Sequence, residues 1–137
     1  MKHVLIDSDV ILDFLTDRFP FSESATGILL LCQKKIIRGY ITPVIVANAC
    51  YILKKSNSHR EIIEQIKNLL TIIDIIQIDK EVILKAANSD FADFEDALQN
   101  FAAVKHGKIN TIITRNSKDY QKSTLAVFTP EMYLKQN

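Results

Sequence analysis

Short apolar runs alternate with longer segments of helical periodicity along this chain of 137 residues, and no other feature limits its fold as strongly. Such runs are typical of strands in a parallel sheet, because helices cover both faces of that sheet and leave no face for polar side chains. We therefore predict an α/β fold, a three-layer α/β/α arrangement around a parallel sheet, with residues 1–137 forming a single domain. The predicted strands are residues 3–6, 39–41, 72–78, 111–114 and 125–128.

The segments between these strands carry the periodicity and the end signals of helices. Ser58 and Glu61 have the spacing of a capping box, in which each side chain satisfies a free backbone N–H at the helix start. The run at 72–78 contains Asp74 and Gln77 among its isoleucines, which favours a half-exposed strand at an edge of the sheet. The predicted helices are residues 10–15, 22–35, 43–55, 58–70, 80–89, 94–106 and 130–135.

The composition excludes several classes of protein. A net charge of +1 means that the chain as a whole has no basic field for nucleic acid, although this does not exclude a local basic strip. Glycine-rich phosphate loops are missing, and Cys32 and Cys50 lack the CxxC spacing, so we predict core thiols in a reducing compartment. The longest uncharged stretch, residues 39–53, is shorter than the ~20 residues of a membrane span. We expect a soluble, cytoplasmic protein without a targeting segment.

An acidic residue, Asp7, directly follows the first predicted strand. In open parallel sheets ligands bind beyond the carboxyl ends of the strands, so this carboxylate stands where a functional site is expected. The alternative interpretation is that Asp7 or Ser8 caps the helix that follows. Position alone does not decide between the two.

A second acidic group lies at the start of the sixth predicted helix. At 100° per residue Asp93, Asp96 and Asn100 gather along one side of the apolar stripe, whereas Glu95 and Gln99 point elsewhere. For Asp93 alone we favour a helix cap, since an acidic first turn suits the helix dipole. For Asp96, which lies beside a face expected to be buried, we favour a role in a site.

A third polar group follows the fourth predicted strand. Thr114, Arg115 and Lys118 are candidate substrate-binding residues, because cations beside an acidic centre can bind phosphates that carboxylates alone would repel. Asp119 is a candidate to support a bound ion, and Asn116 is a candidate to orient its ligands. The alternative interpretation leaves Asn116 as a helix cap and Arg115 in solvent.

These three groups are distant in sequence but are expected to meet at one edge of the sheet. Carboxylates that lie close together are unstable unless one takes a proton or a cation neutralises them. Oxygen ligands favour Mg²⁺ or Mn²⁺ over Zn²⁺, and such an ion activates water and offsets charge during phosphodiester cleavage. We therefore predict that Asp7, Asp93 and Asp96 bind Mg²⁺ or Mn²⁺ in a catalytic centre.

At these residues the sequence resembles the PIN-domain family, and within it the small VapC-type toxin-like nucleases. The resemblance covers nearly the whole chain and rests on four motifs, at residues 4–13 (VLIDSDVILD), 93–99 (DFEDALQ), 113–120 (ITRNSKDY) and 128–131 (FTPE). It implies a parallel sheet of order 3-2-1-4-5 and a Mg²⁺- or Mn²⁺-dependent ribonuclease. In the family pattern Asp7 matches the first metal-binding acid and Asp96 the later acid on the helix, with Asp93 as a nearby candidate.

Two positions depart from this pattern. Members usually carry Glu in the helix after the second strand, where Asn48 stands, and many carry Asp at the position of Asn116. Both departures remove negative charge, so we expect weaker metal binding, with Asn48 and Asn116 orienting ligands. The alternative for Asn48 is a polar side chain that forms local hydrogen bonds.

The resemblance also implies partners. We expect an RNA substrate that is cleaved internally, an antitoxin protein as partner, a homo-oligomer such as a homodimer, and no membrane partner. The alternative function is a catalytically weak or inactive PIN-like module that binds RNA or a protein without cutting. The missing charge at Asn48 and Asn116 motivates this alternative.

Overall fold

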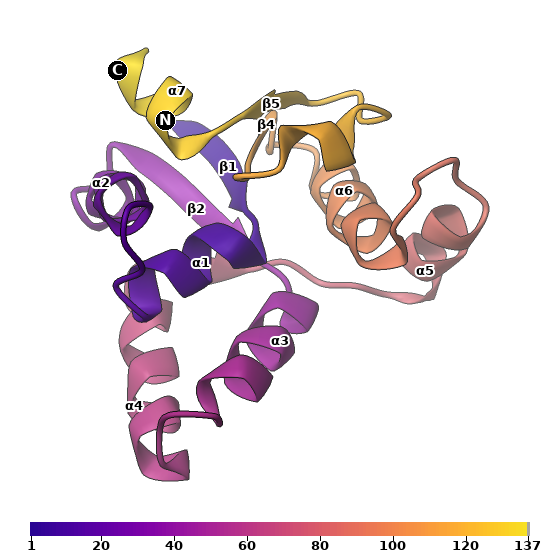
Figure 1. Ribbon diagram of the computed structural model, residues 1–137. Helices are drawn as coiled ribbons and strands as arrows, with labels where there is room; N and C mark the ends of the chain where they lie inside the picture. Colours follow the sequence, from indigo (N-terminus) through magenta and orange to yellow (C-terminus); the bar gives the residue numbers. More distant parts are fainter. Residues whose placement is uncertain (137) are drawn as a thin grey trace.

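The computed structural model of the chain describes residues 1–136 and contains a five-stranded parallel sheet (Figure 1). The strands are β1 (Lys2–Ile6), β2 (Ile37–Ile41), β3 (Asp74–Ile75), β4 (Thr111–Ile113) and β5 (Ala126–Phe128). Their order across the sheet is β3-β2-β1-β4-β5, and every neighbouring pair is parallel. The predicted α/β fold and its strand order are confirmed.

Helices cover both faces of this sheet (Figure 1). They are α1 (Ser8–Leu15), α2 (Ser22–Gln33), α3 (Pro43–Leu53), α4 (His59–Leu70), α5 (Lys80–Ala87), α6 (Phe94–His106) and α7 (Pro130–Lys135), and a 3₁₀-helix, η1 (Ser117–Tyr120), precedes β5. Val4 and Ile6 of β1 belong to the core that α1, α2 and α7 cover, whereas Leu5 belongs to the core beneath α5 and α6. Successive side chains of β1 point to opposite faces of the sheet, so this strand contributes to the core on both faces.

The centre of the sheet is tightly packed. Residues 4–6 are fully buried. A Cβ atom on Gly39 of the neighbouring strand would lie 2.7 Å from Cys32 Sγ and 2.9 Å from Ile6 Cδ1, so glycine lets α2 approach β2 closely. Cys32 is a buried free thiol, as predicted for the core, and Cys50 is free and half-buried.

The third strand is shorter than predicted. Within the predicted strand 72–78 only Asp74–Ile75 pairs, and it pairs with the last two residues of β2. Pairing stops there because β2 ends at Ile41 and Thr42 caps α3. Both residues of β3 are exposed at the edge of the sheet, as expected from the polar residues in this segment.

The predicted helices are all present. Helices α6 and α7 have the predicted bounds, and the others differ by one or two residues at one end. The capping box of Ser58 and Glu61 is formed in both directions. Within residues 1–136 none of the helices combines the length and the apolar character that crossing a bilayer requires.

Candidate active site

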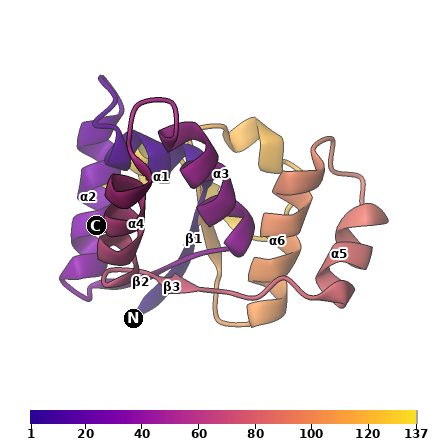
Figure 2. The same cartoon turned by 90° about the horizontal axis from the view of Figure 1, so that it is seen from below.

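The carboxyl end of β1 points toward the side of the molecule on which α1 lies (Figure 2). Asp7 follows β1 directly and is buried, with 7% of its surface exposed. Its Oδ1 accepts a hydrogen bond from the backbone N–H of Ser8 (2.8 Å), and its Oδ2 accepts one from the hydroxyl of Thr114 (2.9 Å). Asp7 therefore caps α1, and the same carboxylate is joined to the polar group after β4.

A tyrosine brings the two main carboxylates into one site. The hydroxyl of Tyr120, at the end of η1, donates to Asp96 Oδ1 at 3.4 Å, and the same hydroxyl lies close enough to Asp7 to influence its pKa. The ring of Tyr120 is buried in the core beneath α6. Asp7 and Asp96 therefore lie within reach of one hydroxyl group. Sequence reasoning gave Tyr120 no role, and the available signal was its place at the end of the third motif.

The negative charges in this site disfavour one another. Burial raises the pKa of Asp7 above its usual value, and the charge of Asp119 adds to this shift. Burial, followed by the charges of Asp7, Asp93 and Asp119, raises the pKa of Asp96 to about 7. Burial also raises the pKa of Tyr120, so this hydroxyl stays protonated and can donate. Shifts of this kind, with identified charged neighbours, are typical of functional sites.

Asp9 extends the site along α1. It accepts hydrogen bonds from the Thr114 hydroxyl (3.3 Å), the backbone N–H of Arg115 (3.2 Å) and the side-chain amide of Asn116 (3.2 Å). Burial and then the charge of Asp7 raise the pKa of Asp9 to about 6. The structure thus gives Asn116 a partner on α1, whereas the alternative interpretation made it a helix cap; it forms no side-chain capping hydrogen bond to η1.

Arg115 is held by a buried acid that the sequence analysis did not single out. Its Nε and Nη2 donate to the two carboxylate oxygens of Asp13 at 2.8 and 3.2 Å. The Asp13 side chain is 2% exposed, and Arg18 lies 3.8 Å away from it. The Arg115 guanidinium also stacks over the ring of Phe21, 4.0 Å from its centroid. Arg115 is therefore neither free in solvent nor free to receive a phosphate in this arrangement.

The remaining predicted residues lie around the carboxylates. Asp93 caps α6 by accepting a hydrogen bond from the backbone N–H of Asp96 (2.9 Å), as favoured for Asp93 from the sequence. Asp119 and Lys118 are exposed on η1. Thr114 is fully buried and donates to Asp7, so its place in the structure is that of a positioning residue and not of a substrate contact.

Two polar pairs join α3 to α6. The side-chain amide of Asn48 donates to Glu95 Oε1 at 3.0 Å, and the hydroxyl of Thr42 donates to the buried Gln99 at 2.5 Å. Asn48 therefore bonds across to another helix, in place of the local hydrogen bonds considered for it. Glu95 and Gln99 point away from Asp96, as expected, and toward α3.

The donor set fits a hard divalent cation. In residues 1–136 no three His, Cys, Asp or Glu side chains are already arranged around one metal position. Asp7 and Asp96 nevertheless share one hydroxyl, and the charges of Asp7 and Asp119 help to raise the pKa of Asp96. Carboxylate oxygens are the ligands that Mg²⁺ and Mn²⁺ prefer, and a cation would relieve the repulsion. Asp7 and Asp96 are the residues that would hold it.

Without divalent ions the protein should become less stable as the pH rises from about 5 to about 8. The pKa values of Asp9 (about 6) and Asp96 (about 7) lie above the ordinary 3.8, so the folded state binds more protons than the unfolded state in this window. Raising the pH removes those protons and favours unfolding. We expect the Tm in EDTA to fall by roughly 3–8 °C, measured by scanning calorimetry.

An Asp96→Asn variant is the control for this profile. Its Tm should change less with pH, because one of the two carboxylates is gone. The carboxyls of Glu61 and Asp79 have lowered pKa values and finish titrating below this window, whereas the lowered pKa of His3 acts in the opposite direction. A wild-type Tm that stays level or rises with pH would show that ionisation of Asp9 and Asp96 does not destabilise the folded state.

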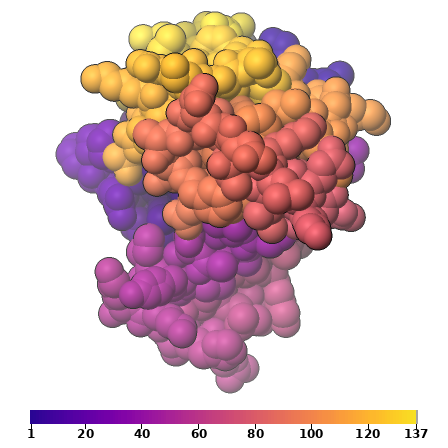
Figure 3. All heavy atoms as spheres, turned by 90° about the vertical axis from the view of Figure 1, so that its right-hand side faces the viewer, coloured from indigo at the N-terminus to yellow at the C-terminus, as the bar shows by residue number. Residues whose placement is uncertain are grey.

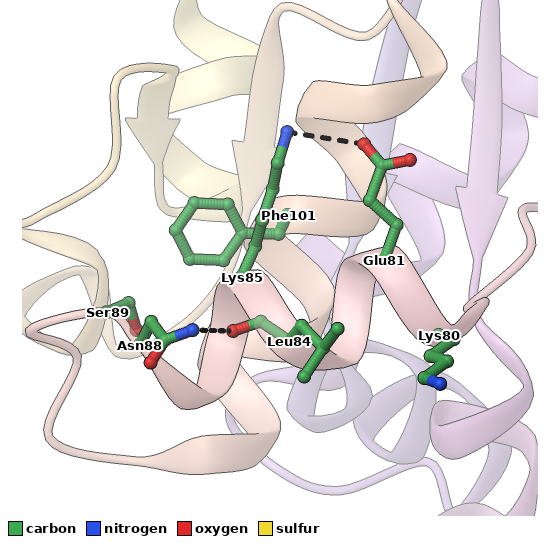
Figure 4. A pocket seen from close by; sticks show the side chains of 7 residues that line it. All are labelled: Lys80, Glu81, Leu84, Lys85, Asn88, Ser89 and Phe101. Atoms are coloured by element: carbon green, nitrogen blue, oxygen red, sulfur yellow. Dashed lines mark hydrogen bonds and ion pairs between the residues drawn. The ribbon is translucent and has the colours of Figure 1, made fainter.

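A hollow lies elsewhere, beside α5 and α6, on the side of the molecule that faces the viewer in Figure 3. It has a volume of about 580 Å³. Its polar groups satisfy one another, since Lys85 lies 3.5 Å from Glu81 and the amide of Asn88 donates to the carbonyl of Leu84 (Figure 4). The carboxylates remain the candidate site, because the pKa values of Asp9 and Asp96 are raised by burial and by neighbouring charges.

Comparison with known proteins identifies the family of this chain. The family model described as PIN domain matches residues 3–118. Ribonuclease VapC1 from Aquifex aeolicus (strain VF5) is 26% identical over 140 residues, covering 96% of this chain and 93% of that protein.

Two solved structures share the fold. A toxin–antitoxin complex from Klebsiella pneumoniae aligns with a TM-score of 0.69 and 20% identity, over 93% of this chain and 97% of that one. VapC20 from Mycobacterium tuberculosis, described as a sarcin-ricin loop cleaving toxin, aligns with a TM-score of 0.61 and 15% identity, over 80% and 86% of the two chains. The match to the family model includes the motifs at 4–13 and 93–99. This chain therefore belongs to the PIN-domain family.

Proposed function

We propose that the protein is a Mg²⁺- or Mn²⁺-dependent endoribonuclease that hydrolyses RNA phosphodiesters at the carboxyl edge of its sheet. The observation that carries the proposal is the convergence of Asp7 and Asp96 on the hydroxyl of Tyr120, where the charge of Asp7 helps to raise the pKa of Asp96. The similarity to a protein named as a ribonuclease supports RNA as the substrate.

The residues around these carboxylates have distinct tasks. A bound divalent ion would activate water and offset the charge that develops on the phosphate. Thr114 donates to Asp7 and Tyr120 donates to Asp96, so both carboxylates are oriented before a substrate arrives. Asp119 adds negative charge to the same centre. Lys118, exposed beside it, is the predicted substrate-binding residue that remains free to meet a phosphate.

An antitoxin protein is proposed as the partner of this chain. The similar structure from Klebsiella pneumoniae is a toxin–antitoxin complex, and this supports a partner of the same kind. A homodimer and a cytoplasmic location stay predictions from the sequence. Size-exclusion chromatography with light scattering tests the homodimer directly.

Cleavage of RNA by the purified protein tests the proposed function. We expect the wild-type protein to cut single-stranded RNA with Mg²⁺ or Mn²⁺ and to stop when EDTA is added. An Asp7→Asn variant should cut at least about 100-fold more slowly, because asparagine still caps α1 but provides no charge for the ion. A DNA strand of the same sequence serves as the substrate control.

Two results would contradict the proposal. Equal cleavage by the wild-type protein and Asp7→Asn would mean that the activity comes from a contaminant or from another site. RNA that is bound but not cut, with either ion, would instead identify the module without catalysis that the asparagines at 48 and 116 suggest.

A further inference from the structure

The loop between α1 and α2 presents an aromatic ring to solvent. Phe19 is 91% exposed, more than any other large hydrophobic residue in the described part of the chain. An aromatic side chain of this size loses much favourable burial in such a position. Its neighbours Asp17, Arg18 and Pro20 are also exposed, and Phe21 is half-buried.

Backbone hydrogen bonds hold this loop in place. The N–H of Arg18 donates to the carbonyl of Asp13 (3.1 Å), and the N–H groups of Phe21 and Ser22 both donate to the carbonyl of Arg18 (2.9 and 2.8 Å). The loop therefore joins α1 to α2 through defined turns. Phe19 lies between these anchored residues, and its ring is displayed by an ordered segment.

A continuous set of contacts leads from this loop to the carboxylates. Arg18 and Arg115 both approach the carboxylate of Asp13, and Arg115 stacks on Phe21. The backbone N–H of Arg115 in turn donates to Asp9, which neighbours Asp7 through the hydroxyl of Thr114. The loop after α1 therefore contacts, through Phe21, the polar group that follows β4, and Phe19 lies two residues before this contact.

We propose that Phe19 stacks on a base of single-stranded RNA near the scissile phosphate, with the adjacent Arg18 facing the backbone of that strand. This inference rests on the proposed function and names Phe19 as a residue that binds the RNA substrate. Unpaired bases stack on aromatic side chains whatever their sequence, and nearby guanidinium groups attract the phosphates. Single-stranded RNA offers a base to the exposed ring and phosphates to Arg18, whose side chain is 47% exposed.

Substitution of Phe19 separates this role from catalysis. We expect Phe19→Ala to lower kcat/KM for single-stranded RNA by roughly ten- to a hundredfold, mostly through KM, and Phe19→Tyr to restore it. Because the side chain is exposed, neither substitution should change the Tm. If wild type and Phe19→Ala cut RNA equally well, the inference is overturned while the proposed function stands.

Fluorescence gives a second measurement that does not depend on cleavage. The chain contains no Trp, so Phe19→Trp introduces a single reporter. In an Asp7→Asn background, which prevents cleavage, we expect a single-stranded oligoribonucleotide to quench its emission in a saturable way. Ile36→Trp, on an exposed residue immediately before β2, provides the matched control and should not respond.

The outcomes of this titration are distinct. Saturable quenching of Phe19→Trp alone supports the inference even if the wild-type protein proves unable to cut. Equal responses of both reporters, or none, overturn it. A dimer that is present in the wild type and lost in Phe19→Ala would also overturn it, because the ring would then be buried by a second copy of the chain.

Discussion

An Asp96→Asn variant should lose at least about 100-fold in RNA cleavage and yet melt at a higher temperature than the wild-type protein. The loss follows from removing one of the two carboxylates proposed to hold the ion. The gain follows because burial and the charges of Asp7, Asp93 and Asp119 raise the pKa of Asp96 to about 7, so its ionised form opposes folding at neutral pH. Because solvent screens part of this effect, we expect the substitution to raise the free energy of unfolding by about 1–2 kcal/mol and the Tm by roughly 3–8 °C.

Asp90→Asn is the matched control for this prediction. Asp90 is an exposed acid in the loop before α6, and the same chemical change there should alter neither the activity nor the Tm. Activity is measured under single-turnover conditions and stability by calorimetry in EDTA. Loss of both activity and stability in Asp96→Asn would show that the side chain supports the fold, and a catalytic role could not then be inferred from the activity.

Asp13→Asn should be the most destabilising single change at this edge of the sheet. The substitution keeps the size of the side chain but removes the charge that holds Arg115 through two hydrogen bonds, with Arg18 nearby. Breaking a buried ion pair leaves the remaining charge without compensation, and we expect a loss of about 2–4 kcal/mol. The Tm should fall by roughly 6–15 °C, measured by circular dichroism.

Asp74→Asn tests whether burial is the reason for the large loss of stability expected of Asp13→Asn. Asp74 pairs with Arg38 at 2.7 Å, as short as the Asp13–Arg115 contact, but both side chains are about half exposed. An exposed pair contributes little, so this variant should lose less than about 1 kcal/mol. If the two variants lose similar stability, the buried position of Asp13 has no special energetic effect.

The outline of the fold could be predicted because the signals for it are local. Residues 4–6 are all apolar, so both faces of this segment are apolar, and this alone indicates a central strand covered on both faces. Pro130 after the capping residue Thr129 marks the start of α7. The length of β3 could not be predicted in the same way. It depends on where β2 ends, and that end is decided by a different part of the chain.

The candidate site was predictable where residues lie at the ends of elements. Asp7 follows a strand and Asp93 precedes a helix, so the role of each position can be predicted from the neighbouring residues in the sequence. Asp13 and Tyr120 do not, because the partners that define them are distant in the chain: Arg115 for Asp13 and Asp7 for Tyr120. Periodicity cannot show that an acid on a short helix is enclosed by arginines, or that a tyrosine joins two carboxylates.

The dependence of the carboxylates on Tyr120 has a consequence for synthesis of the protein. Asp7 leaves the ribosome early and Asp96 much later, but the hydroxyl that aligns them arrives only with η1. A nascent polypeptide that stops before this point carries both acids without the Tyr120 hydroxyl, and its sheet still lacks the edge strand β5. For the proposed ribonuclease, the hydroxyl that serves its carboxylates is therefore added only when translation is nearly complete.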